Sequence, residues 1–106
     1  MKRLLWWLLA GTRGGINRAR IITVLKGRPY NANQLTELLD LDYKTVRHHL
    51  EILVKNGVVV TQGEGYGMMY FLSRDLEDHY GELDEIWEQI GQTGIKETNE
   101  TDDDDK

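Results

Sequence analysis

The fold of this chain is decided by residues 31–57, which read NANQLTELLDLDYKTVRHHLEILVKNG. Two helical patterns, 31–39 and 43–56, follow one another with only a short break between them. Each carries apolar residues at helical spacing: Leu35, Leu38 and Leu39 in the first, and Val46, Leu50, Leu53 and Val54 in the second. Two helices joined by a tight turn are typical of a helix-turn-helix.

The ends of both helices carry the expected capping residues. Asn31 is followed three residues later by Gln34, which predicts a capping box at the start of the first helix. Asp42 can cap the second helix, and Gly57 stands where a left-handed C-terminal stop is expected. These local signals fix the helix boundaries.

The exposed face of the second helix is rich in hydrogen-bond donors. A rotation of about 100° per residue turns Lys44, His48, Glu51 and Lys55 outward and leaves Thr45 and Arg47 on the flanks. Five potential donors therefore crowd the N-terminal half of the helix, the half that a recognition helix inserts into the major groove: Tyr43, Lys44, Thr45, Arg47 and His48. The alternative is an ordinary solvated helix surface.

Residues 41–57 resemble the recognition-helix segment of the ArsR family of winged helix-turn-helix regulators, most of all its archaeal branch. The similarity is carried by the Thr45-Val46-x-x-His49-Leu50 core with Lys55-Asn56-Gly57 after it, and it extends over about residues 16–73. It implies a mainly α fold with a small β-hairpin (α+β) and a role in binding double-stranded DNA.

Composition agrees with one small soluble domain. The 106 residues are 40% apolar and 29% charged, and the absence of cysteine excludes disulfides and thiolate metal sites and fits the cytoplasm. The net charge of −5 is unevenly distributed: residues 1–30 hold seven basic residues and no acidic one, whereas residues 74–106 hold three basic and thirteen acidic residues. A DNA-binding face needs a local positive potential rather than a basic chain.

The N-terminal segment 1–13 is apolar on all sides but far shorter than the roughly 20 residues that cross a bilayer. We expect Leu5, Trp6 and Leu9 to be buried between two subunits. Packing in the core of its own domain, contact with a membrane surface and a signal peptide are the alternatives. The next helix, 16–26, places Arg18, Arg20, Lys26 and Arg28 in exposed positions, where they contact phosphates or only solvent.

Residues 58–62 and 68–72 are predicted to form a β-hairpin in the place of the wing. Its glycine-rich tip, 63–67, has no Lys or Arg, and Glu64 there would repel phosphate. Tyr66 can donate its hydroxyl to DNA. The predicted DNA-binding residues are therefore Tyr43, Lys44, Thr45, Arg47, His48, Lys55 and Tyr66.

Residues 74–90 are predicted to form one long acidic helix with a heptad seam of Leu76, Tyr80, Leu83, Trp87 and Ile90. We expect this seam to pack against its copy in a homodimer; packing within its own domain is the alternative. His79 and Glu82 have a spacing seen among metal ligands of some ArsR-family sensors. The other ligands are missing, so no metal site is predicted.

The predicted divisions are an N-terminal segment 1–13, a winged helix-turn-helix domain 14–73, a dimerisation helix 74–91 and a disordered acidic tail 92–106. The last five residues match an enterokinase recognition sequence, as an expression tag would. No catalytic set, cofactor motif or small-molecule effector site is identifiable. The prediction is a cytoplasmic, homodimeric DNA-binding transcription regulator; the alternative is a winged-helix module that binds a protein or a membrane surface.

Overall fold

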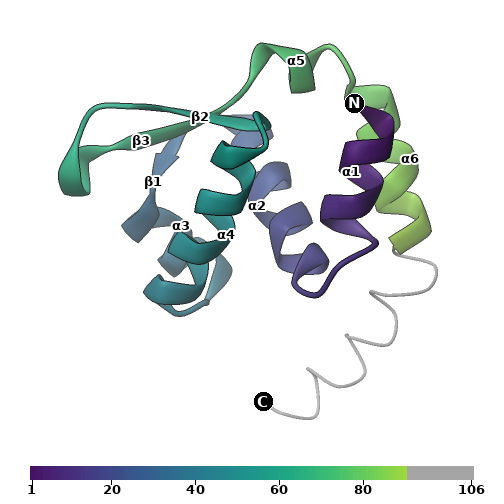
Figure 1. Cartoon of the computed structure of the whole chain (residues 1–106). Helices are drawn as coiled ribbons and strands as arrows, with labels where there is room; N and C mark the ends of the chain where they lie inside the picture. The colour runs from purple at the N-terminus through teal and green to yellow at the C-terminus, as the bar shows by residue number, and fades with distance from the viewer. Residues whose placement is uncertain (91–106) are drawn as a thin grey trace, which may run out of the picture.

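The computed structural model describes residues 1–90, and the predicted tail 92–106 lies outside this range. The elements follow in the order α1 (Lys2–Leu9), α2 (Gly15–Gly27), β1 (Tyr30–Asn31), α3 (Ala32–Leu39), α4 (Tyr43–Lys55), β2 (Val59–Gln62), a 3-10 turn η1 (Gly65–Gly67), β3 (Met69–Leu72), α5 (Arg74–Glu77) and α6 (Tyr80–Ile90). Figure 1 shows α3 and α4 on one side of α2 and the pair α1–α6 on the other. This is the predicted winged helix-turn-helix.

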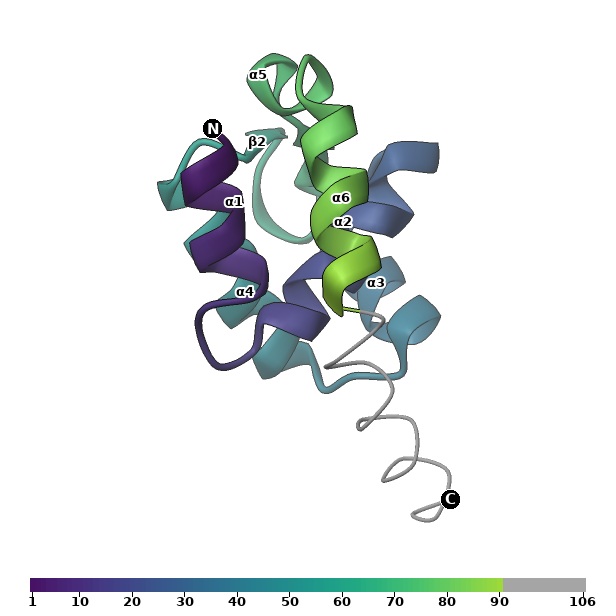
Figure 2. The same cartoon turned by 90° about the vertical axis from the view of Figure 1, so that its right-hand side faces the viewer.

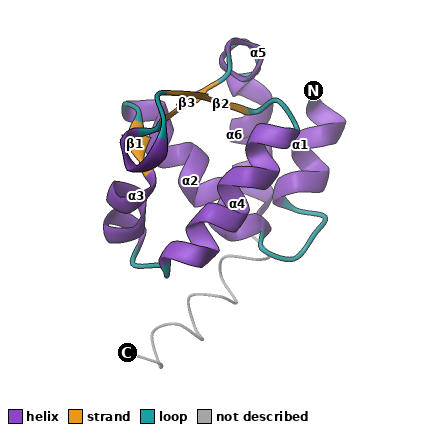
Figure 3. Cartoon of the chain, turned by 60° about the vertical axis from the view of Figure 1, so that its left-hand side comes forward, coloured by secondary structure: helices purple, strands orange, loops and turns teal. Residues whose placement is uncertain are grey.

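The sheet has the strand order β1–β3–β2 with antiparallel pairing throughout. In β2 and β3, Val59 pairs with Leu72 and Gln62 with Met69, so the hairpin predicted from the β-rich runs 58–62 and 68–72 is present. The two-residue strand β1 was not predicted. Its residues Tyr30 and Asn31 pair with Tyr70 and Met69 and so join the end of β3 nearest the hairpin tip to the start of α3 (Figure 3).

The predicted caps are confirmed. The Asn31 side chain accepts a hydrogen bond from the Gln34 amide, and Gln34 in turn accepts from the Asn31 amide, which closes the capping box. Asp42 caps α4 by accepting from the amide of Thr45. Gly57 has a φ of 75°, the left-handed conformation that glycine tolerates best after a helix end.

One continuous core joins all six helices and the sheet. Val46, Leu50 and Leu53 of α4 are fully buried in it, as their spacing predicts. Two members of the predicted apolar stripes are not: Leu38 is 54% exposed and Val54 is 38% exposed. The apolar faces of α3 and α4 are therefore narrower than the sequence suggests.

The single helix predicted for residues 74–90 is wrong, because the chain breaks between α5 and α6. Ser73 caps α5, and the amide of His79 bonds back to the carbonyl of Leu76, three residues earlier, which tightens the chain and ends the helix. The buried stripe of α6 is Leu83, Ile86 and Ile90, with Tyr80 and Trp87 half-buried beside it.

The apolar N-terminal segment finds its burial inside the chain. Helix α1 packs against α2 and α6, so Leu5, Leu8 and Leu9 are buried in the core (Figures 1 and 2). The expectation that a second subunit buries Leu5, Leu9, Leu76, Leu83 and Ile90 is corrected, since one chain already encloses all five. Of the predicted interface residues, Trp6, Tyr80 and Trp87 keep accessible surface, and Trp7 beside them is 53% exposed. No helix among the described residues is long and apolar enough to span a membrane.

Candidate nucleic-acid interface

The candidate interface is the outer face of α4. Burial of the inner face in the core determines which side chains point outward. With Val46 and Leu50 held in the core, Lys44, His48, Glu51 and Lys55 are exposed, and Tyr43, Thr45 and Arg47 are half-buried on the flanks. The structure thus brings six of the seven predicted DNA-binding residues onto one helix. The seventh, Tyr66, lies at the tip of the wing and is 79% exposed.

The flanking side chains are already held by their neighbours. Thr45 donates its hydroxyl to Asp42, 3.2 Å away, in addition to the backbone cap. The Arg47 guanidinium lies 3.4 Å from the Tyr43 hydroxyl and 3.5 Å from a carboxylate oxygen of Glu51. The Tyr43 contact, followed by the neighbouring charges, raises the pKa of Arg47, so this side chain stays a cation at any working pH. Lys44 and His48 make no such contact among the described residues and are the freest donors.

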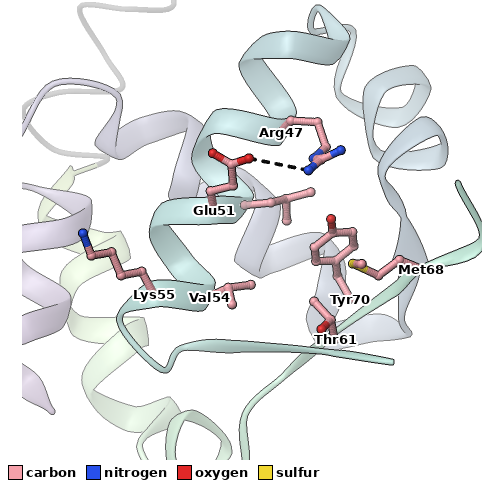
Figure 4. A pocket seen from close by; sticks show the side chains of 8 residues that line it. Arg47, Glu51, Val54, Lys55, Thr61, Met68 and Tyr70 are labelled. Atoms are coloured by element: carbon pink, nitrogen blue, oxygen red, sulfur yellow. Dashed lines mark hydrogen bonds and ion pairs between the residues drawn. The ribbon is translucent and has the colours of Figure 1, made fainter. Parts of the chain in front are cut away.

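A groove of about 320 Å³ separates α4 from the wing. Figure 4 shows Arg47 on the side of α4 that faces Thr61, Met68 and Tyr70 of the hairpin, whereas the Lys55 side chain extends to the other side. Leu50 and Val54 complete the lining, so the floor is apolar and the rim is charged. Tyr70 is buried there, and burial raises the pKa of its hydroxyl. An apolar floor of this kind suits the methyl group on the edge of a thymine better than a phosphate.

The tip of the wing differs sharply from the helix. Its 3-10 turn, Gly65–Gly67, presents Glu64 and Tyr66 to solvent, and no residue from 63 to 67 is basic. A carboxylate at this position opposes a phosphate backbone, and the Tyr66 hydroxyl is the one side-chain donor of the tip.

The basic residues of α2 do not form the exposed face that the sequence predicts. Arg18 is only 3% exposed, which overturns its predicted position on the surface. Arg20 donates to the carbonyl of Leu39, 2.7 Å away, and thereby holds the end of α3. Lys26 stands over the Tyr80 ring and pairs with Asp84, and Arg28 stacks on Tyr30. Lys26 and Arg28 are exposed and keep their charges near the surface.

The sequence did not lead us to predict that Arg18 and His49 are buried; His49 is only 6% exposed. A signal was present for Arg18: it lies four and seven residues before Ile22 and Leu25, on the buried stripe of its helix. His49 directly precedes the buried Leu50, but its neighbour His48 faces solvent, so the pair of histidines is divided between inside and outside.

No group of three or more potential metal-binding side chains gathers within residues 1–90. The ring of His79 makes a hydrogen bond of 2.7 Å to the carbonyl of Asp75, which occupies its Nδ1 atom. The arrangement of donors on α4 suits a polyanion with base edges.

Comparison with known proteins agrees with this geometry. Residues 17–61 match the family model described as "Bacterial regulatory protein, arsR family", over less than half of the 106-residue chain. No curated protein has significant sequence similarity to the chain. The matched segment runs from α2 to the middle of β2 and so contains α3 and α4.

Two solved structures share the fold. A probable transcriptional regulator from Pseudomonas aeruginosa superimposes with a TM-score of 0.63 at 20% identity, covering 94% of this chain and 82% of its own. RV1404 from Mycobacterium tuberculosis superimposes with a TM-score of 0.59 at 15% identity, covering 91% of this chain and 72% of its own. At these identities the similarity shows the fold alone, a winged helix-turn-helix.

Proposed function

We propose that this protein is an ArsR-family transcription regulator that binds double-stranded DNA as a homodimer and reads an inverted repeat with residues 43–56. The observation that carries the proposal is the donor-rich outer face of α4, held rigidly by the buried Val46, Leu50 and Leu53. The family-model match over residues 17–61 supports it. Membership of the archaeal branch and a cytoplasmic location belong to the same proposal.

Within α4, the residues have different roles in this proposal. Lys44 and Arg47 contact guanine edges or nearby phosphates, while Thr45 and His48 contact bases or the backbone. Arg47 exchanges its contact with Glu51, made through Nη2 at 3.5 Å, for a DNA contact. Lys55 lies further along the helix, near the wing, and serves a phosphate.

The dimer is proposed from the surface that α1 and α6 leave accessible. The accessible aromatic side chains there include Trp6, Trp7 and Trp87. Partly exposed aromatic residues of this size are common anchors of protein interfaces. Sedimentation at micromolar concentration should give a dimer, and Trp87→Ala should shift it toward monomer. A monomeric parent protein would refute this part of the proposal.

The experiment that tests the function is selection of duplexes from a random pool by the full chain. Two copies of α4 related by a two-fold axis read half-sites about 34 Å apart, one turn of B-DNA. We therefore expect enrichment of an inverted repeat with centres about 10 base pairs apart. Recovery of no common sequence, with weak binding to every duplex, would contradict the proposal.

A second function, binding to a protein or a membrane surface, is favoured by one observation. Trp7 is 53% exposed on α1, and the exposed Arg3 precedes it by four residues on the same helix. An apolar ring beside cations is typical of segments that rest on anionic lipid. Cosedimentation with anionic vesicles that is lost in Trp7→Ala, together with failure of the duplex selection, would favour this function.

A further inference from the structure

A buried arginine connects the N-terminal helix to α4. The Arg18 guanidinium donates from Nε to the carbonyl of Leu8, 2.9 Å away, and from Nη2 to the Thr12 hydroxyl and to the carbonyl of Arg13, at 3.1 Å. Its Nη1 lies 3.1 Å from Nδ1 of His49. One side chain thus joins the end of α1, the α1–α2 turn and α4.

The contact between Arg18 and His49 fixes the state of the imidazole. A guanidinium can only donate, so Nδ1 of His49 must accept, and the ring proton is on Nε2. Burial, then the charges of Arg18 and of the adjacent His48, lower the pKa of His49 to about 4. These two side chains are the titratable groups that act on His49, so the ring is neutral near pH 7.

The α1–α2 turn lies against His49 so closely that it excludes side chains. Gly14 has a φ of 86°, and a Cβ there would stand 2.6 Å from Cε1 of the His49 ring. A Cβ on the next residue, Gly15, would stand 2.2 Å from the carbonyl oxygen of Leu9. Both distances are shorter than real contacts, so Gly14 packs directly on the His49 ring and Gly15 on the end of α1.

The network is a costly way to obtain stability alone. Within residues 1–90, no carboxylate pairs with Arg18, which leaves its charge compensated by carbonyls, a hydroxyl and an imidazole. An apolar residue of similar volume would avoid the desolvation of this cation. The guanidinium contributes directional hydrogen bonds instead. It is planar, and its donors bond to three segments of the chain, which holds these segments in one relative geometry.

From these observations we infer that Arg18 is a positioning residue, which holds α4 in its DNA-binding orientation by linking His49 to the α1–α2 turn. This inference rests on the proposed function. It adds a residue that determines DNA affinity without touching DNA itself.

The decisive variant is Thr12→Val, which removes one acceptor of Arg18 from the turn and leaves the outer face of α4 unchanged. Thr12→Ser keeps the hydroxyl, and Thr23→Val makes the same change on the outside of α2, where the hydroxyl bonds only to the Ala19 carbonyl. Residues without ligand contact modulate coupling by roughly 2- to 30-fold. We expect Thr12→Val to weaken binding to a labelled duplex from the selection within this range, and both controls to bind like the parent.

His49 offers an independent test by rescue. Asn places its carboxamide oxygen near the position of Nδ1 and can accept from Arg18, whereas Leu cannot. His49→Asn should therefore retain DNA affinity within about threefold, and His49→Leu should lose roughly as much as Thr12→Val. Circular dichroism and thermal unfolding of each variant separate loss of orientation from loss of folding; if His49→Leu does not fold, the Thr12 pair decides.

NMR spectroscopy of the imidazole nitrogens tests this inference independently of the proposed function. In a long-range proton–nitrogen spectrum at pH 7.5, His49 should carry its proton on Nε2, and Thr12→Val should shift its ring signals. If the parent selects no duplex, the proposed function fails but this signature still stands. If the parent binds DNA and Thr12→Val, folded, binds equally well, or if the proton is on Nδ1, the positioning role is refuted.

Discussion

Helix α4 and the wing lie next to each other, yet they present very different surfaces to a nucleic acid. The exposed part of α4 carries Lys44, His48 and Lys55, with Arg47 at its flank, whereas the tip of the wing carries Glu64 and Tyr66 and no cation. The helix is held by fully buried residues; the tip, residues 63–67, is exposed throughout. In this winged helix the wing therefore forms one wall of the groove, and α4 supplies the positive charge.

The largest expected effect comes from the buried side of α4. Leu50 is fully buried, so Leu50→Ala should lower the free energy of unfolding by about 2–5 kcal/mol. DNA binding should fall only as far as the folded fraction falls. Urea unfolding followed by circular dichroism measures the first quantity. A variant of parental stability that no longer binds DNA would show that Leu50 contacts DNA directly.

The next largest effect is a dependence of stability on pH through His49. Its pKa of about 4 in the folded state lies below the ordinary value of about 6.5, so the unfolded chain binds the extra proton between these values. Stability contributed by neutral His49 is complete above about pH 6.5 and is lost as the pH falls toward 4. Between pH 7 and pH 5 the loss should be about 2 kcal/mol.

His49→Asn isolates this contribution, because the amide does not titrate. Urea unfolding of the parent and of His49→Asn at both pH values gives the difference in their pH dependence. Identical slopes for the two proteins would contradict the buried, neutral imidazole.

The outer face of α4 should show its effect in binding rather than in stability. Arg47→Ala should leave the unfolding transition close to that of the parent, because its ion pair with Glu51 is exposed and such pairs contribute little. It should lose about 1–3 kcal/mol of specific DNA binding for each base contact. Fluorescence anisotropy with the selected duplex measures this, and loss of affinity equal for all duplexes would assign Arg47 to a phosphate instead.

The smallest effect is expected at the wing. Glu64→Gln removes an exposed negative charge and should strengthen DNA binding by less than about 1 kcal/mol, because exposed charges are screened. Tyr66→Phe should weaken it by a similar amount if the hydroxyl meets the backbone. An effect of either variant larger than that of Arg47→Ala would reverse the comparison between helix and wing.

The parts of the fold that sequence predicts correctly are those governed by nearby residues. The capping box of Asn31 and Gln34, the cap at Asp42 and the left-handed Gly57 each need only three or four neighbouring residues. The outward position of Lys44 and His48 follows from the same local periodicity. For this reason the helix-turn-helix and the composition of the candidate interface were predictable.

The errors concern burial that depends on distant partners. Arg18 can be buried because Leu8 and His49 accept its hydrogen bonds. These acceptors lie ten and thirty-one residues away in the sequence, so the residues around Arg18 do not reveal them. Leu5 and Leu9 are covered by α2 and α6 rather than by a second chain. The break before α6 places Ile86 on the buried side in place of Trp87. Periodicity identifies an apolar face but does not identify what covers it.

The central claim, that α4 reads DNA, is tested most directly by a salt titration of the parent and the double variant Lys44→Ala/Arg47→Ala on the selected duplex. For the parent, the logarithm of affinity should fall linearly with the logarithm of salt concentration, because each neutralised phosphate releases counterions. The double variant should lose specific affinity and show a shallower slope, by about one for each phosphate contact removed. Superimposable titrations of the two proteins would contradict the account, because DNA binding would then not depend on these side chains of α4.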